Sequence, residues 1–310
     1  RVLWHAIDAL QRRYEFVEIV VYTGDRNQSD DDITSKVFDR FHISMIRPVH
    51  FQRLFLRRLV EAEMWPRVTI LGQSFGSVIL GLEALVAFVP HVFIDSTGYA
   101  FTVPLFRWVG GSRTASYVHY PTVSTDMIHV VENSVRAFNN NTRYTTSGAW
   151  RRLKVKYYQL FAKLYGVAGR RNDVVMVNSS WTYNHIKQIW NSASLSIVYP
   201  PCDTSAFLGV PLEREGRDIR VVSIGQFRPE KKHEMQLDIM KELKRSLVSA
   251  QWRKTRLVFI GGVRNATDEN KVKELKDLAT QLNILDNVEF KTNISFDALR
   301  EELSTATIGL

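Results

Sequence analysis

The stretch Ile219–Lys232, IRVVSIGQFRPEKK, limits most strongly what this chain can fold into. It opens with a short, mostly branched and apolar run, which predicts a buried strand of a parallel sheet. Gly225 permits a tight turn after the strand, and the residues from His233 onward have the spacing of an amphipathic helix. The pattern therefore predicts a strand–loop–helix unit of an α/β domain.

The loop of this unit is positively charged. Loops at the carboxyl ends of parallel strands are where open α/β sheets bind ligands. This loop contains Arg228, Lys231 and Lys232, and the next helix is expected to present its N-terminal N–H groups beside them. An anion such as a phosphate is the ligand that these groups favour. The alternative is an ordinary connecting loop whose basic side chains are solvated.

Strand and helix patterns alternate on both sides of one break in the chain. Expected strands are 17–22, 41–46, 68–71, 92–95, 115–119, 173–178, 196–199, 219–224, 257–260 and 288–291. Expected helices are 2–11, 77–89, 150–165, 180–190, 234–249, 268–282 and 296–304. Asp30–Asp32 is expected in a solvated loop, and the polar segment Gly209–Asp218 in a linker. Alternation of this kind predicts two α/β domains with parallel sheets, residues 1–208 and 209–310, facing a cleft. The second is expected to be incomplete, because residues 306–310 read as the start of a strand.

Net charge is +9, and the excess lies in one stretch. Residues 133–172 contain nine basic residues and no acidic one, and the rest of the chain carries 32 of each. Within this stretch, Trp150–Tyr165 predicts a basic amphipathic helix able to lie on an anionic membrane surface. Its charge comes chiefly from Arg151, Arg152, Lys154 and Lys156. The alternative is a core helix with its basic residues in water. No nucleic-acid motif accompanies the patch, so nucleic acid is not an expected partner.

Composition excludes several other classes of function. The single cysteine, Cys202, excludes an internal disulfide, and no cluster of His, Cys, Asp and Glu has metal-ligand spacing. We therefore expect no metal and no cofactor. The apolar segment Ser77–Val89 contains Glu83 and ends at Pro90, which is shorter than the roughly 20 residues of a membrane span.

Gly72–Gly76, GQSFG, fits the G-x-S-x-G pattern of a nucleophile elbow and lies between an expected strand and an expected helix. This predicts, as an alternative function, a serine hydrolase with Ser74 as nucleophile. Its partners would be Asp95 or Asp126 and His119 or His185. The competing interpretation is that Ser74 caps the helix and the glycines permit close strand–helix packing.

His119 lies at the carboxyl end of an expected strand, in the segment TASYVHYP. A lone histidine is most often structural. At a strand end that faces a cleft, its imidazole is able to bind a sugar hydroxyl or stabilise developing charge.

Several segments together resemble one group of known proteins: LGQSFGSVILGLEAL, DSTGYAFTVPLF, SYVHYPTVSTDM, DVVMVNSSWTYNHI, VYPPCD, GQFRPEKKH and NVEFKTNISFDALREELSTATIGL. On these residues the chain resembles the retaining GT-B glycosyltransferases of family 4. Within that family it is similar to the mannosyltransferases that extend dolichol-diphosphate-linked oligosaccharides. The resemblance implies a GT-B fold and metal-free α-1,2 transfer of the fourth and fifth mannoses from GDP-mannose. It also implies work at the cytosolic face of the endoplasmic reticulum membrane, with other mannosyltransferases of the pathway as further partners.

The resemblance also implies roles for single residues. His119 matches the family's histidine near the donor sugar, and Lys231 matches the lysine that holds the donor diphosphate. Gly225 matches the glycine of the same loop. Gln226 stands where most relatives have arginine, so Arg228 is expected to supply that cation.

Two further segments match the donor domain of the family. Gly261 and Gly262 match its second glycine turn, and Lys291–Ile294, which includes Asn293, matches the loop whose backbone meets the guanine base. A glycine-rich acceptor loop is expected before Arg1 and an E-x7-E segment after Leu310. The 310 residues alone are therefore expected to be inactive, with residues 1–208 facing acceptor and membrane and 209–310 binding the GDP-sugar.

Overall fold

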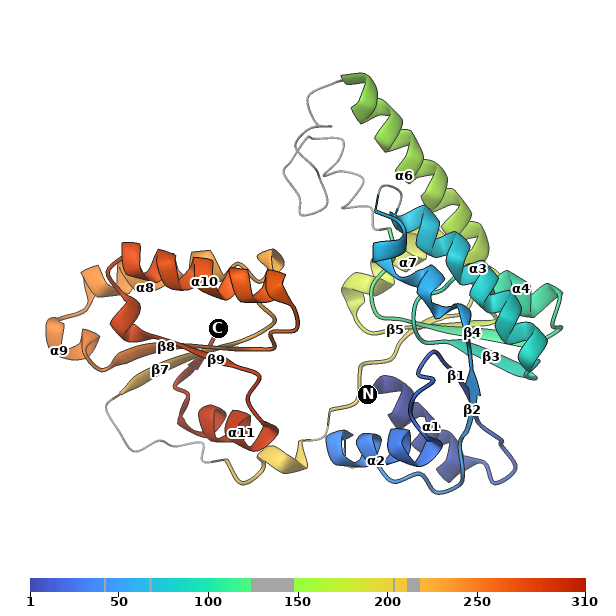
Figure 1. Cartoon of the computed structure of the whole chain (residues 1–310), viewed down its shortest axis with the longest axis horizontal. Helices are drawn as coiled ribbons and strands as arrows, with labels where there is room; N and C mark the ends of the chain where they lie inside the picture. The colour runs from blue at the N-terminus through green and yellow to red at the C-terminus, as the bar shows by residue number, and fades with distance from the viewer. Residues whose placement is uncertain (42, 67–68, 124–147, 203, 211–217) are drawn as a thin grey trace. The chain divides into compact units, whose positions relative to one another are not determined.

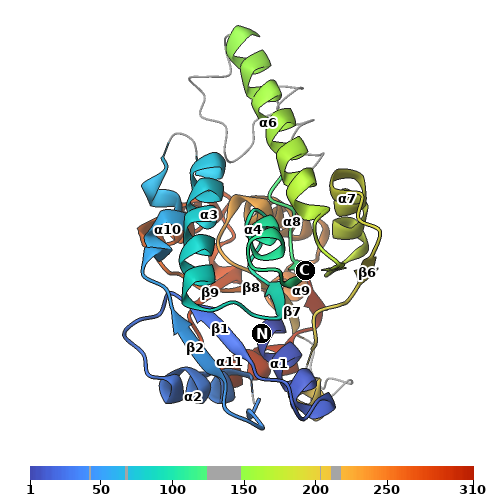
Figure 2. The same cartoon turned by 90° about the vertical axis from the view of Figure 1, so that its right-hand side faces the viewer.

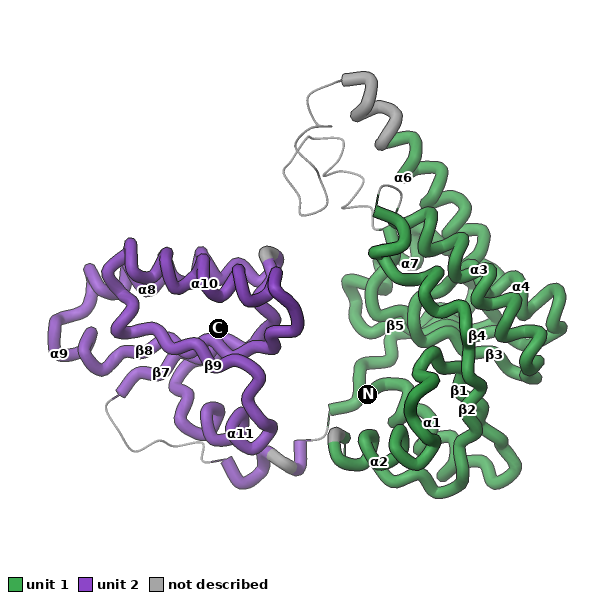
Figure 3. Tube along the Cα trace, viewed as in Figure 1, with its two compact units in different colours: residues 1–202 green, residues 203–310 purple. Residues whose placement is uncertain are grey.

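The computed structural model describes residues 1–310 except 42, 67–68, 124–147, 203 and 211–217 (Figure 1). The chain divides into two compact units, residues 1–202 and 203–310, drawn green and purple in Figure 3. The division lies after Cys202, a few residues before the boundary expected from the polar linker.

Unit 1 is built on two parallel sheets. The four-stranded sheet has the order β3-β4-β5-β6, with strands Val92–Asp95, Arg113–Val118, Val174–Val177 and Leu195–Ile197. The two-stranded sheet pairs β1, Val20–Thr23, with β2, His50–Arg53. The helices are α1 Val2–Arg13, α2 Asp30–Phe41, α3 Thr69–Ala87, α4 Thr102–Trp108, α6 Gly148–Gly169 and α7 Ser180–Trp190, with short 3₁₀ turns at Leu56–Val60 and Ala62–Met64.

The core of unit 1 forms where α6 and α7 cover the four-stranded sheet. Phe161 and Tyr165 of α6 pack with Trp190 of α7 and with Val175 and Val177 of β5. A Cβ on Gly169 would lie 2.0 Å from the Trp190 ring, so glycine lets α6 end against that indole. Figure 2 shows α6 running as one long helix past the sheet.

Unit 2 is a single four-stranded parallel sheet with the order β10-β7-β8-β9. The strands are β7 Ile219–Ile224, β8 Thr255–Gly261, β9 Val288–Thr292 and β10 Ile308–Gly309. Its helices are α8 His233–Ser246, α9 Ser249–Trp252, α10 Ala266–Gln281 and α11 Phe296–Thr305, with 3₁₀ turns at Ser205–Phe207, Pro229–Lys231 and Leu285–Asn287. Leu237, Leu257, Phe259 and Leu275 fill its core. The expected alternation of strands and helices in this half is therefore confirmed.

Three expectations for unit 1 are wrong. Asp30–Asp32 is the first turn of α2 rather than a loop, because Ser29 and Asp32 cap each other's backbone N–H groups at 3.0 and 3.1 Å. The expected strand 41–46 is not formed by its described residues, and β2 lies later, at His50–Arg53. The expected strand 68–71 is helical from Thr69 onward.

The early start of α3 also changes its length. Among the described residues, α3 is the one helix that is long and apolar enough to cross a membrane by length and composition alone. Its residues Leu80, Ala84 and Leu85 are nevertheless buried against Phe106 of α4. A buried face of this kind is what a core helix of a globular unit shows.

Candidate functional site

The loop after β7 is held against the sheet by its glycine. The Gly225 N–H donates to the carbonyl oxygen of Ile260 at 2.9 Å. A Cβ at residue 225 would lie 3.4 Å from Cδ of Lys231, so the aliphatic stem of that lysine crosses the glycine. The Lys231 N–H donates to the carbonyl oxygen of Arg228 at 3.0 Å, and Lys232 adopts a left-handed conformation with φ 52°. The loop therefore folds back on itself and places Lys231 over the strand end.

The charges of this loop are only weakly neutralised within unit 2. Arg228 lies 3.9 Å from the carboxylate of Glu230, and both side chains are about half exposed. An exposed pair of this kind contributes little energy. Among the described residues, neither the Lys231 nor the Lys232 ammonium forms an ion pair, and both side chains are exposed. The loop thus offers cations to an anion beside the N-terminus of α8.

Buried polar side chains support this loop from behind. The Gln236 side-chain amide donates to the carbonyl oxygen of Lys231 at 3.1 Å. The His233 ring is buried, stacks on Phe227 at 5.3 Å and meets Phe259 edge-on at 5.2 Å. Burial lowers the pKa of His233 below its ordinary value. The imidazole therefore acts as a neutral packing group under the cationic loop.

The second and third loops of the same sheet edge are tied to each other through Asn293. Its φ is 54°, and its backbone N–H donates to the carbonyl oxygen of Gly261 at 3.0 Å. Its side chain accepts from the Val263 N–H at 2.9 Å and donates to the Val263 carbonyl oxygen at 3.1 Å. The nearest atom to a Cβ on Gly262 would be the Asn293 side-chain oxygen, 3.8 Å away. The Asn293 side chain therefore holds the turn, which leaves backbone groups as the surface of this loop.

The carboxyl edge of the unit 2 sheet thus brings together all seven residues predicted for donor binding. Gly225, Gln226, Arg228 and Lys231 follow β7. Gly261 ends β8, Gly262 follows it, and Asn293 follows β9. Gln226 is exposed and Arg228 is partly exposed. This arrangement is able to accept an anion. That these residues bind the sugar donor stays a prediction.

His119 follows β4 in unit 1 and is exposed. Its ring meets Tyr117 edge-on at 4.9 Å, and its carbonyl oxygen accepts from the Thr182 hydroxyl at 3.5 Å. Asp95 ends the neighbouring strand β3 and caps its own loop, accepting from the Thr97 and Gly98 N–H groups at 3.0 Å each. Burial raises the pKa of Asp95 while these bonds oppose the shift. Asp95 is therefore a structural carboxyl, and His119 is free to meet a ligand.

The helix predicted to face a membrane is α6, Gly148–Gly169, which is six residues longer than the expected helix 150–165. The side chains of Arg151, Arg152 and Lys154 lie outside the described residues, and Lys156 is exposed. The apolar stripe divides, because Phe161 is buried in the core whereas Leu160 and Leu164 are 61% and 47% exposed. The helix is therefore partly a core helix and partly an apolar surface.

The hydrolase alternative is wrong. Gly72–Gly76 lies inside α3, so Ser74 is neither on a strand-to-helix elbow nor a helix cap. A Cβ on Gly72 would lie 2.2 Å from the Trp65 ring, and one on Gly76 would lie 2.0 Å from the Leu59 carbonyl oxygen. The glycines serve close packing of the helix on the preceding segment. Asp126, the other proposed acid, lies outside the described residues.

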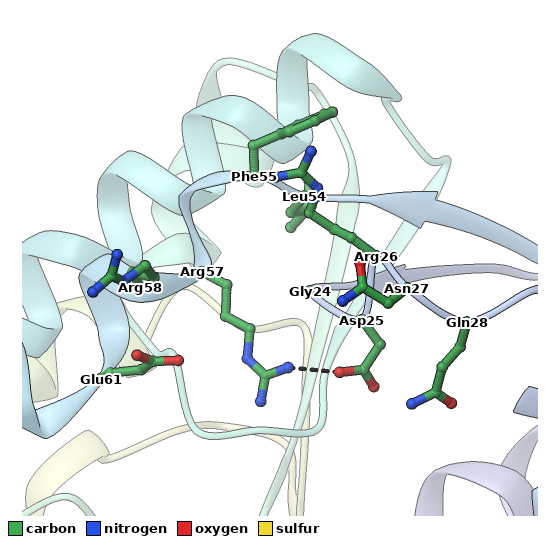
Figure 4. A pocket seen from close by; sticks show the side chains of 10 residues that line it. All are labelled: Gly24, Asp25, Arg26, Asn27, Gln28, Leu54, Phe55, Arg57, Arg58 and Glu61. Atoms are coloured by element: carbon green, nitrogen blue, oxygen red, sulfur yellow. Dashed lines mark hydrogen bonds and ion pairs between the residues drawn. The ribbon is translucent and has the colours of Figure 1, made fainter.

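The part of the chain that the structure describes offers few other candidate sites. No group of three or more His, Cys, Asp or Glu residues there is able to hold a metal ion. Sequence reasoning missed a polar hollow in unit 1, lined by the loops after β1 and β2 (Figure 4). The arginines around Arg57 were the one sequence signal for this hollow. Nothing in the neighbouring sequence, however, predicts that they lie beside residues 24–28.

Comparison with known proteins agrees with the resemblance seen in the motifs. Residues 1–190 match the family described as ALG11 mannosyltransferase N-terminus, and residues 210–309 match glycosyl transferases group 1. Proteins named GDP-Man:Man(3)GlcNAc(2)-PP-Dol alpha-1,2-mannosyltransferase align over all of this chain. The identity is 50% for the mouse protein, 49% for the human protein and 46% for that of Dictyostelium discoideum. The chain spans 64%, 64% and 63% of these relatives.

Solved structures share the fold at low identity. A UDP-forming α,α-trehalose-phosphate synthase from Burkholderia vietnamiensis superposes with a TM-score of 0.59 at 13% identity, covering 94% of this chain and 76% of that one. Anabaena HepE, in complex with UDP and glucose, gives 0.55 at 11% identity, covering 99% and 69%. The expected GT-B class of two α/β units with parallel sheets is confirmed. With its first 190 residues matching that family, the chain belongs to the ALG11 mannosyltransferase family.

Proposed function

We propose that the full-length protein is a retaining α-1,2-mannosyltransferase. It moves mannose from GDP-mannose to a dolichol-diphosphate-linked oligomannose and adds the fourth and fifth mannoses. The observation that carries the proposal is the exposed cationic loop at the carboxyl edge of β7. The chain that carries this loop also aligns throughout with relatives named α-1,2-mannosyltransferases.

The donor diphosphate is proposed to bind at this loop. Transfer of a sugar from its nucleotide leaves negative charge on the departing diphosphate. Lys231, Arg228 and the N-terminal N–H groups of α8 supply positive charge there without a divalent ion. Gly225 and Gly261 keep side chains out of the way of the phosphates, and backbone groups near Asn293 meet the base. No metal or cofactor enters this proposal.

His119 is the proposed catalytic residue. Its exposed imidazole follows β4, at the carboxyl edge where α/β domains bind substrates. From there it is able to hydrogen-bond a hydroxyl of the donor mannose as positive charge develops on the sugar. His119→Ala is expected to lower kcat more than it raises the KM for GDP-mannose.

The acceptor carries a polyprenyl lipid, and α6 is the proposed membrane-facing element. Lys156 is exposed on α6, as are Leu160 and Leu164, which suits a surface that meets lipid headgroups and acyl chains. The proposed location is the cytosolic face of the endoplasmic reticulum membrane. Other mannosyltransferases of the same pathway are proposed neighbours there.

The test is transfer by the purified full-length protein on anionic liposomes, with GDP-mannose and a Man3GlcNAc2-diphosphate-lipid acceptor. The proposal predicts a Man5 product with α-1,2 linkages and undiminished activity in EDTA. The matched control is the same reaction with UDP-glucose, which should give no product. Absence of mannose transfer under these conditions, with the protein shown to be folded, would contradict the proposal.

A further inference from the structure

Unit 1 contains a hollow of about 440 Å³ that the proposed donor site does not use (Figure 4). Its walls come from the loop after β1, residues 24–28, and the segment after β2, residues 54–58, together with Glu61. The two strands are paired in parallel, with Thr23 opposite Arg53, so both loops leave the same edge. The volume lies in the range of roughly 300–1,000 Å³ that is usual for small-ligand pockets.

The walls of this hollow are held in place by contacts of their own. A Cβ on Gly24 would lie 2.1 Å from Cδ of Arg57, so glycine lets the arginine stem pass beneath the first loop. The Arg57 guanidinium then pairs with Asp25 at 2.6 Å, the dashed line in Figure 4. Glu83 of α3 accepts from the Phe55 and Leu56 N–H groups at 2.6 and 3.0 Å, which fixes the second loop. The site is therefore preorganised.

The lining carries both hydrogen-bond donors and acceptors. Asn27, Arg58 and Glu61 line the hollow, and among the described residues their side chains make no hydrogen bond or ion pair. Phe55 is 61% exposed, and the Arg26 guanidinium lies 4.2 Å from its ring centroid. Amide, guanidinium and carboxylate groups beside an exposed ring match the mixed donor and acceptor pattern of sugar hydroxyls.

A phosphate group fits the same lining poorly. Arg57 and Asp25 already neutralise each other, so a dianion would meet the positive charges of Arg26 and Arg58 but also the carboxylate of Glu61. Vicinal hydroxyls of a sugar, by contrast, donate to a carboxylate and accept from a guanidinium or amide at once. The chemistry of the hollow therefore favours an uncharged polyhydroxyl ligand.

The hollow also adjoins the loop that follows β3. Tyr99 of that loop packs with Leu54 of the hollow in one apolar cluster. Burial raises the pKa of Tyr99, and the nearby charges of Arg57 and Glu61 act on its hydroxyl as well. Strand β3 pairs in parallel with β4, so its loop emerges at the edge where His119 follows β4. A ligand in the hollow is therefore bound on the side of unit 1 that presents the proposed catalytic residue.

We propose that this hollow binds mannose residues of the acceptor oligosaccharide. The inference rests on the proposed mannosyl transfer and names the part of the acceptor that unit 1 holds. Asn27, in the loop after β1, and Arg58, in the segment after β2, bind hydroxyls from two different walls. Glu61 accepts hydroxyl hydrogens, and the Phe55 ring covers an apolar sugar face.

The test is steady-state kinetics of the full-length protein on liposomes, with N27A and R58A as single and double variants. Both side chains are exposed and make no hydrogen bond or ion pair among the described residues, so folding should be kept. The double variant is expected to raise the KM for the Man3GlcNAc2 lipid acceptor about tenfold or more. The KM for GDP-mannose should change less than twofold. R12A is the matched control and should resemble the wild type, because the Arg12 side chain is exposed and, within the described part of the chain, pairs only with Asp8 of its own helix α1.

Saturation-transfer NMR with free α-mannotriose gives an arm that is independent of turnover. The wild-type protein should show transfer to the sugar, and the double variant should lose most of it. An unchanged acceptor KM together with unchanged sugar binding would overturn the inference while leaving mannosyl transfer intact. Sugar binding that is competed by inorganic pyrophosphate would overturn it in favour of a phosphate site. If the wild-type protein transfers no mannose but still binds the trisaccharide, the proposed function is contradicted and the sugar site is not.

Discussion

Gly261 lies so close to Gly225 that a Cβ at residue 261 would stand 2.2 Å from the Gly225 carbonyl oxygen. The same Cβ would lie 2.9 Å from the Phe227 ring. The end of β8 and the cationic loop after β7 are therefore in direct backbone contact. Any side chain at residue 261 must displace the loop that carries Lys231.

Gly261→Ala is expected to destabilise unit 2 by about 1–3 kcal/mol, because the contacted atoms are backbone and cannot rotate away. It should also raise the KM for GDP-mannose. Gly262→Ala is the matched control for stability, since the nearest atom to its Cβ would be 3.8 Å away and its backbone is not left-handed. Thermal unfolding and donor kinetics of both variants check this. Equal stability of the two would show that the contact does not constrain the loop.

The buried His233 predicts a pH dependence of stability. Its pKa is lowered in the folded protein, with burial as the main cause, so the unfolded chain takes up this proton more readily. Its contribution to stability is complete above about pH 6.5, the ordinary histidine pKa. That contribution is lost as the pH falls from there through the lower folded pKa.

His233→Phe should remove this part of the pH dependence. The aromatic ring keeps its packing between Phe227 and Phe259, and the buried Nδ1, which has no hydrogen-bond partner among the described residues, disappears. Glu234 favours the charged imidazole, whereas Lys271 and Lys231 oppose it, and all three remain in the variant. Thermal unfolding from pH 7.5 to 5 should therefore show a smaller loss for the variant. Parallel curves for wild type and variant would contradict this account.

Gly76 and Ser74 should respond oppositely to alanine. A Cβ on Gly76 would lie 2.0 Å from the Leu59 carbonyl oxygen, so Gly76→Ala is expected to cost about 1–3 kcal/mol of stability. Ser74→Ala places a better helix former inside α3 and should leave mannosyl transfer and stability close to the wild type. Unfolding midpoints and transfer assays on both variants decide this. Loss of activity in Ser74→Ala would mean that the serine has a role which its place in the helix does not suggest.

Charge on α6 should govern association with membranes. Reversal of Arg151, Arg152, Lys154 and Lys156 to glutamate is expected to weaken binding to vesicles containing phosphatidylserine by tenfold or more, since each basic residue contributes about 1 kcal/mol at such a surface. The control reverses Lys273, an exposed lysine of α10 in unit 2, together with its exposed neighbour Lys276. Cosedimentation at low and high salt measures both. Binding that survives the reversal would argue against α6 as the lipid-facing element.

Unit 2 could be predicted from the sequence nearly element by element. The run Ile219–Ile224 is confirmed as β7 with the same bounds, because a short apolar run followed by glycine has few other ways to fold. Helix α11 was expected at 296–304 and ends one residue later, at Thr305. Here local preference and burial agree, so periodicity alone is informative.

The part of unit 1 up to α4 is harder to predict, since local signals compete there. Three consecutive aspartates suggest a loop, yet Ser29 and Asp32 form a capping box that starts α2. Helix α4, Thr102–Trp108, was missed because it contains Pro104, which is tolerated in a first turn whose N–H groups are unpaired in any case. At both places the sequence contains a signal that favours a helix and another that favours a loop.

The cationic loop could be predicted because all its charges lie within one short segment. The hollow in unit 1 could not, since it arises from the parallel pairing of β1 with β2 and so joins two loops that are far apart in the sequence. The Asn293 clamp on Val263 was likewise hidden, because it depends on the neighbouring ends of β8 and β9. Both features depend on how strands that are distant in the sequence pair with each other, rather than on the types of residue they contain.

The most direct test of the account is the kcat/KM for GDP-mannose of the full-length protein with Lys231→Met and Arg228→Ala combined. Methionine keeps an apolar stem over Gly225 and removes the charge, so the loop should stay folded. Two lost charge-assisted contacts to phosphate, each worth about 1.5–3 kcal/mol, predict a loss of at least about 100-fold. Lys273→Met, on exposed α10, should match the wild type. A double variant with unchanged kcat/KM would contradict the claim that these cations hold the donor diphosphate.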